Sequence, residues 1–345
     1  MAGKIQLLSD EVIGKIAAGE VVERPAAAIK ELVENSLDAG ASAVTVEIRD
    51  GGISYFRVTD NGSGIRGEDI RMAFERHATS KIRRTDDLFS IQTLGFRGEA
   101  LASIAAVAHV TCTTRTKADQ SGIKVQNNGG TIESIEEAAC PEGTTFVVRN
   151  LFFNTPLRLK FLKKPFTEAV YVSDLMMRLI LSRPDVSFRY ISQGKTLYHS
   201  AGDGKLSSAV FSIYGCEMLH SMHEVDGHQA GLILKGFVGV GESGRGSRNH
   251  QSFFINGRYM KSSILSAAVE AACRERVLSG KYPTCVLHLT MPYDTVDVNV
   301  HPNKLEVRFQ NEAAVAEAVE AIVADALADK APVEQPEVLR LTPEP

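Results

Sequence analysis

The stretch Gly95-Phe96-Arg97-Gly98 has a composition that suits phosphate binding. An alanine-rich helix is predicted directly after it, over residues 99–106. Glycines before a helix leave backbone N–H groups open to a ligand, and the helix dipole favours an anion at that end. The stretch therefore predicts a phosphate-binding loop that needs no Walker sequence. The alternative is a flexible loop that ends in a helix cap.

Asp60 ends a predicted strand and is followed by Gly62 and Gly64. A carboxylate beside such approachable backbone offers an acceptor to a flat base with an exocyclic amine. Thr144, after Gly143 at the start of another predicted strand, adds a hydroxyl for the base or a bridging water. A plain Asn-Gly turn is the alternative at Asp60, and a glycine-threonine pair at a strand start is common.

Glu31, Asn35 and Asp38 follow one another at intervals of four and three residues. With 3.6 residues per turn, a helix places all three on one face. The apolar residues Ile29 and Val33 occupy another side. The alternative is an amphipathic surface helix with a polar stripe, which is the usual outcome of such a pattern.

The elements that carry these residues are a helix and a hairpin near the start of the chain. Pro25 suits the first position of a helix over residues 25–39, and Gly40 suits its C-terminal cap. Alternating apolar residues predict strands over 44–48 and 55–59, joined by a turn at 50–52. Further helices are predicted over 99–106, 167–181, 205–214, 263–278 and 312–328, and further strands over 110–115, 123–126, 144–149, 187–192, 196–199, 232–240, 251–255 and 284–289.

The composition is that of a globular chain with two domains. The chain has 345 residues, of which 44% are hydrophobic and 23% are charged. A small, polar stretch at 201–204 predicts the boundary between the domains, and four prolines within 331–345 predict the start of a linker.

The net charge and the cysteines indicate the class of protein and the compartment in which it works. The net charge of −4 argues against a dedicated nucleic-acid coat protein, although a local basic groove remains open. The five cysteines are widely spaced, which predicts free thiols in a reducing compartment. No signal peptide or run of 18 apolar residues is found, so we expect a cytoplasmic protein without a membrane partner.

Three other patterns in the sequence give little support to the binding functions they could suggest. Residues 239–244 match a dinucleotide-binding fingerprint, but a predicted strand follows where that fingerprint requires a helix. His220, His223 and His228 match no strong metal-binding template and are interpreted as surface residues. The basic cluster at 158–164 is more typical of a solvated face than of a phosphate track.

Four stretches described above resemble the motifs of the GHKL ATPases, which include DNA gyrase B, the ninety-kilodalton heat-shock chaperone, histidine kinases and MutL. They are residues 31–35, 60–64, 95–98 and 143–144. The order and spacing match the four motifs of that family. The resemblance then narrows to the MutL mismatch repair proteins, through longer blocks that span most of residues 5–310. These blocks are residues 16–25, 30–40, 76–81, 94–104, 153–156, 254–258 and 296–304.

The resemblance implies an α/β fold, an α+β sandwich. Residues 1–203 would form a GHKL ATP-binding domain, 204–330 a domain like ribosomal protein S5, and 331–345 the start of a proline-rich linker. It also implies that Glu31 acts as the general base, Asn35 holds Mg²⁺ and Lys304 reaches the γ-phosphate. Residues 79–98 would form a lid over the triphosphate. The nucleotide-binding positions so implied are Asn35, Asp38, Asp60, Gly62, Gly64, Thr79, Lys81, Gly95, Phe96, Arg97, Gly98 and Thr144.

The implied function is that of an ATP-dependent DNA mismatch repair matchmaker. Such a protein binds ATP with Mg²⁺, hydrolyses it slowly and forms a homodimer on ATP binding. Its implied partners are MutS, a downstream repair nuclease or helicase, and DNA held weakly and without sequence specificity. We expect no endonuclease activity in this chain, and association with the nucleoid if the source is bacterial.

Two other functions stay open. A histidine kinase would carry a phosphoacceptor helix upstream, and only 24 residues precede Pro25. A non-enzymatic DNA-binding scaffold would have no need of Glu31.

Overall fold

A computed structural model describes residues 21–78, 99–297 and 307–328. The chain divides into two compact units, residues 1–213 and 214–345. The division falls near the end of helix α6 (Leu206–Tyr214), whereas the sequence predicts a boundary just before this helix. Among the described residues, no helix combines the length and the apolar character needed to cross a bilayer.

The first unit is built on an eight-stranded mixed sheet in the order β5-β4-β3-β6-β2-β1-β7-β8. Neighbouring strands are antiparallel except β1 and β7, which are parallel. The strands are β1 (Ala43–Arg49), β2 (Tyr55–Asp60), β3 (His109–Arg115), β4 (Gly122–Asn128), β5 (Thr131–Ala138), β6 (Gly143–Arg149), β7 (Ser187–Ser192) and β8 (Lys195–His199).

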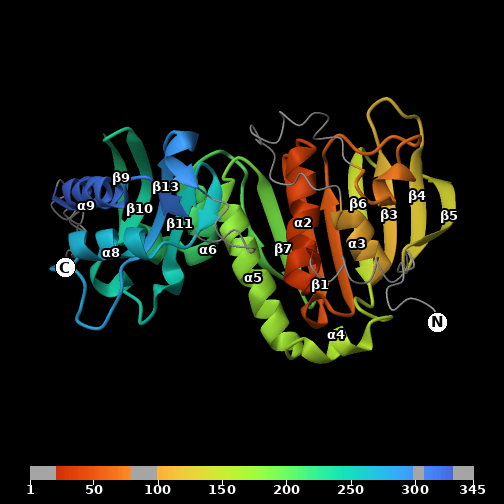
Figure 1. Ribbon diagram of the computed structural model, residues 1–345, viewed down its shortest axis with the longest axis horizontal. Coiled ribbons are helices and arrows are strands. Elements are labelled where there is room, and N and C mark those ends of the chain that lie inside the picture. The colour runs from red at the N-terminus through yellow and green to blue at the C-terminus, as the bar shows by residue number, and fades with distance from the viewer. Residues whose placement is uncertain (1–20, 79–98, 298–306, 329–345) are drawn as a thin grey trace, which may run out of the picture. The chain divides into compact units, whose positions relative to one another are not determined.

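Helices cover one face of this sheet. Helices α2 (Pro25–Asp38), α3 (Ala100–Ala106) and α5 (Pro165–Ser182) lie on the same side of the strands (Figure 1). Every second residue of β1, namely Val44, Val46 and Ile48, is buried beneath them. The short helix α4 (Pro156–Phe161) precedes α5. This is the α/β sandwich that the sequence predicts.

Helix α2 begins and ends where its sequence predicts. Pro25 occupies the first turn, where its missing N–H costs nothing. At the other end Gly40 adopts a φ of 74°, its N–H donates to the Leu37 carbonyl, and the Ala41 N–H donates to the Ser36 carbonyl. These bonds form the paired C-terminal cap that a residue in the left-handed region allows. The predicted hairpin of β1 and β2 also forms, with a 3-10 turn at Asp50–Gly52.

The second unit holds a five-stranded sheet in the order β12-β11-β13-β10-β9. Its strands are β9 (Met222–Gln229), β10 (Leu232–Gly239), β11 (Gln251–Ile255), β12 (Arg258–Met260) and β13 (Thr284–Thr290). Helices α8 (Ser263–Ala272) and α9 (Glu312–Ala328) contact each other, and α9 contacts β9 and β10. Apolar residues from these helices and strands form a core of their own. The unit also contains α7 (Cys216–His220) and a small pair of strands, β14 (Val296–Asp297) and β15 (Arg308–Phe309).

Candidate functional site

Asp60, the last residue of β2, joins three parts of the first unit. Its Oδ2 accepts a hydrogen bond of 2.7 Å from the Ser36 hydroxyl on α2. Its Oδ1 accepts from the N–H groups of Gly62, at 2.9 Å, and Thr144, at 3.2 Å. Only 8% of Asp60 is exposed. A negative acceptor is therefore held in place before any ligand arrives.

Thr144 reaches Asp60 because β2 and β6 are neighbours. The two residues are opposite each other in the antiparallel register, although 84 residues separate them in the chain. Gly143 precedes Thr144 with a φ of 114°, and a Cβ at this position would overlap the Asp60 carbonyl oxygen. The close approach of the two strands at the site therefore requires glycine.

The loop after Asp60 is held at both ends. The Asn61 side-chain oxygen accepts hydrogen bonds from the N–H groups of Ser42 and Ala43, at 2.9 and 2.8 Å. Gly64 has a φ of 71°, and a Cβ there would overlap the backbone of Arg115. These contacts give the two predicted glycines different tasks: Gly62 donates its N–H to Asp60, and Gly64 lets the loop pass beside β3.

Ser36 and Thr114 belong to this cluster, and the sequence did not predict a role for either. Ser36 lies one residue beyond Asn35 but on the buried side of α2, where it is 3% exposed. The Thr114 hydroxyl on β3 contacts the Ile65 N–H, the Gly143 carbonyl and the Thr144 hydroxyl. For Ser36, the only feature of the sequence that could have indicated a role was its place beside Asn35 in a predicted helix. For Thr114, the sequence offers no such feature, because its contacts depend on how the strands pair.

Cys112 lies two residues before Thr114 on the same buried face of β3. Burial raises the pKa of its thiol well above the ordinary range, and the nearby negative charge of Asp60 raises it further. The thiol therefore stays protonated at neutral pH and behaves as an apolar side chain beside the site.

Glu31, Asn35 and Asp38 are partly exposed along α2, as their shared face predicts. Ile29 and Val33 are fully buried on the other side. The same helix thus contacts Asp60 through Ser36 and keeps Asn35, the preceding residue, on a partly accessible side. Glu31 lies about one helical turn before Asn35, so α2 brings both side chains into the same region of the unit.

Several predicted site residues lie outside the described part of the chain. They are Thr79, Lys81, Gly95, Phe96, Arg97, Gly98 and Lys304. Two described residues on either side of the predicted lid lie close together: the His77 Nδ1 and the Glu99 Oε1 are 3.1 Å apart. This contact brings His77 and Glu99 together at the start of α3.

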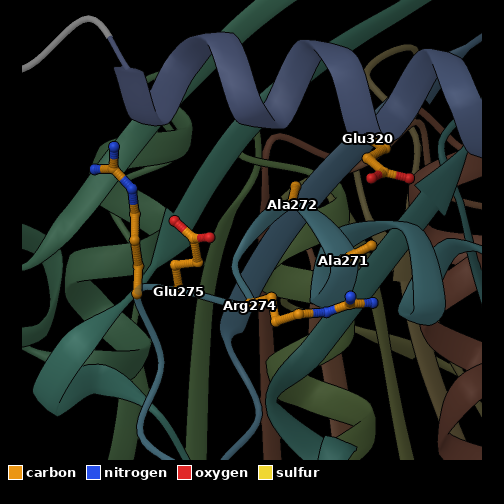
Figure 2. Close-up of a pocket in the computed structure, with 6 residues that line it drawn as sticks. Ala271, Ala272, Arg274, Glu275 and Glu320 are labelled. Carbon is orange, nitrogen blue, oxygen red and sulfur yellow. The ribbon is translucent and has the colours of Figure 1, made fainter.

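A separate cavity lies in the second unit and contains none of the predicted residues. Figure 2 shows Arg274, Glu275 and Glu320 around it, with Ala271 and Ala272 at the end of α8. Its volume is about 270 Å³, and Arg276 completes the lining. Two arginines and two glutamates balance each other there, which gives no preference for either sign of charge. Among the described residues, no group of three or more His, Cys, Asp or Glu residues is arranged so that it could hold a metal ion.

Two protein-family models match the chain, one in each unit. Residues 23–145 match the family described as histidine kinase-, DNA gyrase B-, and HSP90-like ATPase. Residues 210–328 match the C-terminal domain family of DNA mismatch repair proteins. The first match contains Glu31, Asn35, Asp60 and Thr144.

Curated relatives and solved structures agree with these matches. The DNA mismatch repair protein MutL of Agathobacter rectalis is 48% identical over 89% of this chain and 47% of the relative, and that of Thermoanaerobacter pseudethanolicus is 45% identical over 94% and 53%. The chain spans about half the length of the curated relatives it matches.

The Aquifex aeolicus MutL ATPase domain complexed with ADP is 26% identical, with a TM-score of 0.65 over 91% of this chain and 100% of the other. The N-terminal domain of a DNA repair protein is 25% identical, with a TM-score of 0.77 over 91% and 97%. With its ATPase match, its mismatch repair match and its MutL relatives, the chain belongs to the MutL family of DNA mismatch repair proteins, of which it carries the GHKL ATPase region.

Proposed function

We propose that this chain binds ATP with Mg²⁺ and hydrolyses it slowly, and that ATP binding pairs two copies to couple mismatch recognition to repair. The observation that carries the proposal is the buried carboxylate of Asp60, held by donors from α2, from β6 and from the loop that follows β2. A fixed acceptor of this kind suits the exocyclic amine of adenine. The ADP in the related Aquifex aeolicus structure supports the same ligand class.

The remaining roles are part of the same proposal. Glu31 would orient or deprotonate the attacking water, since a carboxylate one water away from a γ-phosphate can act as a general base. Lys304 would contact the γ-phosphate as a compact charge on a long stem. Asp38, Thr79, Lys81 and residues 95–98 would complete the nucleotide site.

Asn35 fits the proposed Mg²⁺ by its chemistry. Its side-chain amide supplies an oxygen on a partly exposed side of α2. Mg²⁺ prefers oxygen ligands and keeps several waters, so one protein oxygen together with phosphate oxygens is a reasonable set. When bound, the ion would neutralise charge on the phosphates.

At the level of the full protein, we propose a matchmaker. Its partners would be MutS, a downstream nuclease or helicase, and DNA bound weakly and without sequence specificity, in the cytoplasm and at the nucleoid of a bacterium. The ATP-binding domain would comprise residues 1–203, the S5-like domain 204–330 and a linker 331–345. The mismatch repair names of the relatives support this assignment.

The test compares ATP hydrolysis by the purified chain with that of Glu31→Ala. We expect slow hydrolysis that requires Mg²⁺, and a loss of about 100-fold or more in the variant, since general bases typically contribute 10²–10⁴-fold. ATP binding should stay within about threefold of the wild type, because Glu31 contacts water and not the base. Glu137→Ala on the exposed edge strand β5 is the control and should hydrolyse ATP normally.

Light scattering with a non-hydrolysable ATP analogue tests the pairing of copies. A shift from monomer to dimer on adding the analogue is expected for both the wild type and Glu31→Ala. A folded wild-type chain that neither binds nor hydrolyses ATP would refute the proposal and favour the scaffold function. Loss of ATP binding in folded Glu31→Ala would refute the role of that residue.

A further inference from the structure

We propose that residues 157–171 form a docking surface for an acidic segment of a partner protein that also carries apolar side chains. The range covers most of helix α4, the beginning of helix α5 and the loop that joins them. We call it the α4–α5 surface. It contains no residue of the proposed nucleotide site, so the inference goes beyond the proposed function.

The apolar side chains of the α4–α5 surface are unusually exposed. Phe161 and Phe166 are 84% and 81% exposed, and Leu157 is 71% exposed. The other exposed apolar side chains of the surface are Leu159, Val170 and Tyr171. Single exposed apolar residues are normal in folded proteins, whereas a group of them within one short stretch marks an interaction site.

Each helix presents its exposed apolar side chains on one face. Leu157 and Phe161 are four residues apart on α4 and therefore share a face of that helix. Phe166 and Val170 have the same spacing on α5. Because α4 leads into α5 through the short loop at 162–164 (Figure 1), the two apolar pairs lie at either end of one loop.

This loop is held in place by hydrogen bonds from α5. The Glu168 Oε1 accepts a bond of 3.0 Å from the Lys163 N–H. The Lys164 carbonyl accepts bonds of 2.8 and 3.1 Å from the N–H groups of Thr167 and Glu168. The loop backbone is thus fixed before a partner arrives, which lowers the conformational ordering that docking requires.

The α4–α5 surface also carries an excess of positive charge. Its basic residues are Arg158, Lys160, Lys163 and Lys164, and its single acidic residue, Glu168, is 0% exposed. None of the four cations forms an ion pair with a residue in the described ranges. The Nη1 of Arg158 is buried and has no hydrogen-bond partner there. A buried donor without a partner is costly, and a carboxylate is an acceptor that a guanidinium binds strongly.

The combination of charge and apolar area selects the class of partner. Unpaired cations favour an acidic occupant, and a nucleic acid would also meet that requirement. Nucleic acids contact such surfaces by phosphate pairing and by stacking bases on aromatic rings, which leaves aliphatic side chains such as Leu157 and Val170 without a counterpart. An acidic protein segment with its own apolar side chains satisfies the charges and covers the aliphatic and aromatic residues together.

The test uses random linear peptides displayed on phage, selected on the full chain. We expect the selected peptides to combine Asp or Glu with large apolar residues. Their Kd is then measured by fluorescence anisotropy with synthetic copies. In Phe161→Ala/Phe166→Ala and in Lys160→Glu/Lys163→Glu the Kd should rise about tenfold or more, since a few central residues dominate such interfaces.

Two matched controls change the same residue types elsewhere in the chain. Leu278 is 66% exposed and Lys195 is exposed on β8. Leu278→Ala and Lys195→Glu should leave the Kd within about twofold of the wild type. Replacing the acidic residues of a selected peptide by Asn and Gln gives a measurement on the wild-type chain that does not depend on how any variant folds, and it should weaken binding to a similar extent.

Acidic, apolar peptides that lose affinity for both surface variants and keep it for both controls support the inference. A selection that enriches no such peptide overturns it, and so does equal binding to folded surface variants. Binding of single-stranded oligothymidylate through Lys160 and Lys163, without any selected peptide, would overturn it in favour of a nucleic acid. Self-association that Phe161→Ala/Phe166→Ala abolishes, again without a selected peptide, would overturn it in favour of a second copy of the chain.

The surface variants should hydrolyse ATP at the wild-type rate, because none of the substituted residues belongs to the proposed nucleotide site. Failure of the docking inference would therefore leave the proposed ATPase function intact. A wild-type chain that selects acidic peptides but binds no ATP would refute the proposed function alone.

Discussion

The side chain of Asp60 shows how the chain stabilises a buried carboxylate, which in the proposed function also accepts a hydrogen bond from the ligand. A buried carboxylate is costly unless hydrogen-bond donors replace the water it has lost. The Ser36 hydroxyl and the N–H groups of Gly62 and Thr144 supply these donors. Because all three come from the protein, the acceptor is oriented before the ligand binds, and less ordering is needed on binding.

Gly143 is the residue beside this site that should tolerate substitution least. In Gly143→Ala the new Cβ would overlap the Asp60 carbonyl oxygen, and the φ of 114° disfavours any side chain. We expect a loss of about 3 kcal/mol or more in the free energy of unfolding, measured by urea denaturation, together with weaker ATP binding.

Gly194→Ala is the control for this prediction. Gly194 has a φ of 77°, and no atom lies within 4 Å of the position that a Cβ would take, so only the backbone penalty applies. This variant should lose about 1 kcal/mol. Equal losses in the two variants would mean that the Cβ overlap at Gly143 has no energetic effect.

At the scale of elements, the sequence predicts a helix or strand best where local residues mark both its buried face and its two ends. Helix α2 has Pro25 at its start, Gly40 at its end and a regular apolar stripe, and it forms as predicted. The hairpin of β1 and β2 was equally clear, because apolar and polar residues alternate on both sides of a glycine turn.

Elements whose formation depends on distant partners were predicted less well. Strand β5 contains three glutamates and is half exposed at the sheet edge, so its own sequence gives little sign of a strand. Strand β9 is similarly polar. Helix α8 was predicted to reach residue 278 but ends at Ala272. One reason is that the Arg276 carbonyl accepts a hydrogen bond from the distant Gly241 N–H.

The same distinction applies to the site. The proposed roles of Asp60 and Thr144 were readable because glycines and a family pattern surround them. Ser36 and Thr114 were not, because their contacts exist only once α2 packs on the sheet and β3 pairs with β6 in one register. The lid residues and Lys304 stay predictions, since they lie outside the described ranges.

Helix α8 gives a test at this scale through its N-terminal cap. The Ser262 hydroxyl accepts a hydrogen bond of 3.2 Å from the Leu265 N–H. Ser262→Ala leaves that N–H without its partner and should lower the free energy of unfolding by about 1 kcal/mol. Hydrogen exchange should report faster exchange at Leu265. Ser262→Asp keeps an acceptor and should behave like the wild type; a loss equal to that of the alanine variant would contradict the capping role.

At the scale of the whole molecule, the five cysteines lie in both units, and none of them forms a disulfide, as their spacing predicts. Cys112, Cys273 and Cys285 are buried, Cys140 is partly buried and Cys216 is exposed. We expect a thiol reagent at pH 8 to modify Cys216 quickly and Cys140 more slowly, with the other three reacting only on unfolding. Mass spectrometry of the labelled peptides identifies each site, and rapid labelling of Cys112 or Cys273 would contradict the packing of its unit.

Two of these thiols also make the free energy of unfolding depend on pH in the alkaline range. Burial raises the pKa of Cys273 to about 12, and it raises the pKa of Cys112 further. An unfolded thiol has a pKa of about 8.5, so above that pH the unfolded chain loses protons that the folded chain keeps. A raised folded pKa therefore stabilises the protein fully below about pH 8.5 and progressively less as the pH rises toward the folded value.

Urea denaturation of the wild type and of Cys112→Ala/Cys273→Ala between pH 7 and 10 tests this linkage. The double variant should be less stable at pH 7 because of the cavities it creates, but its stability should fall less steeply with pH. Parallel slopes for the two proteins would mean that other groups account for the alkaline loss.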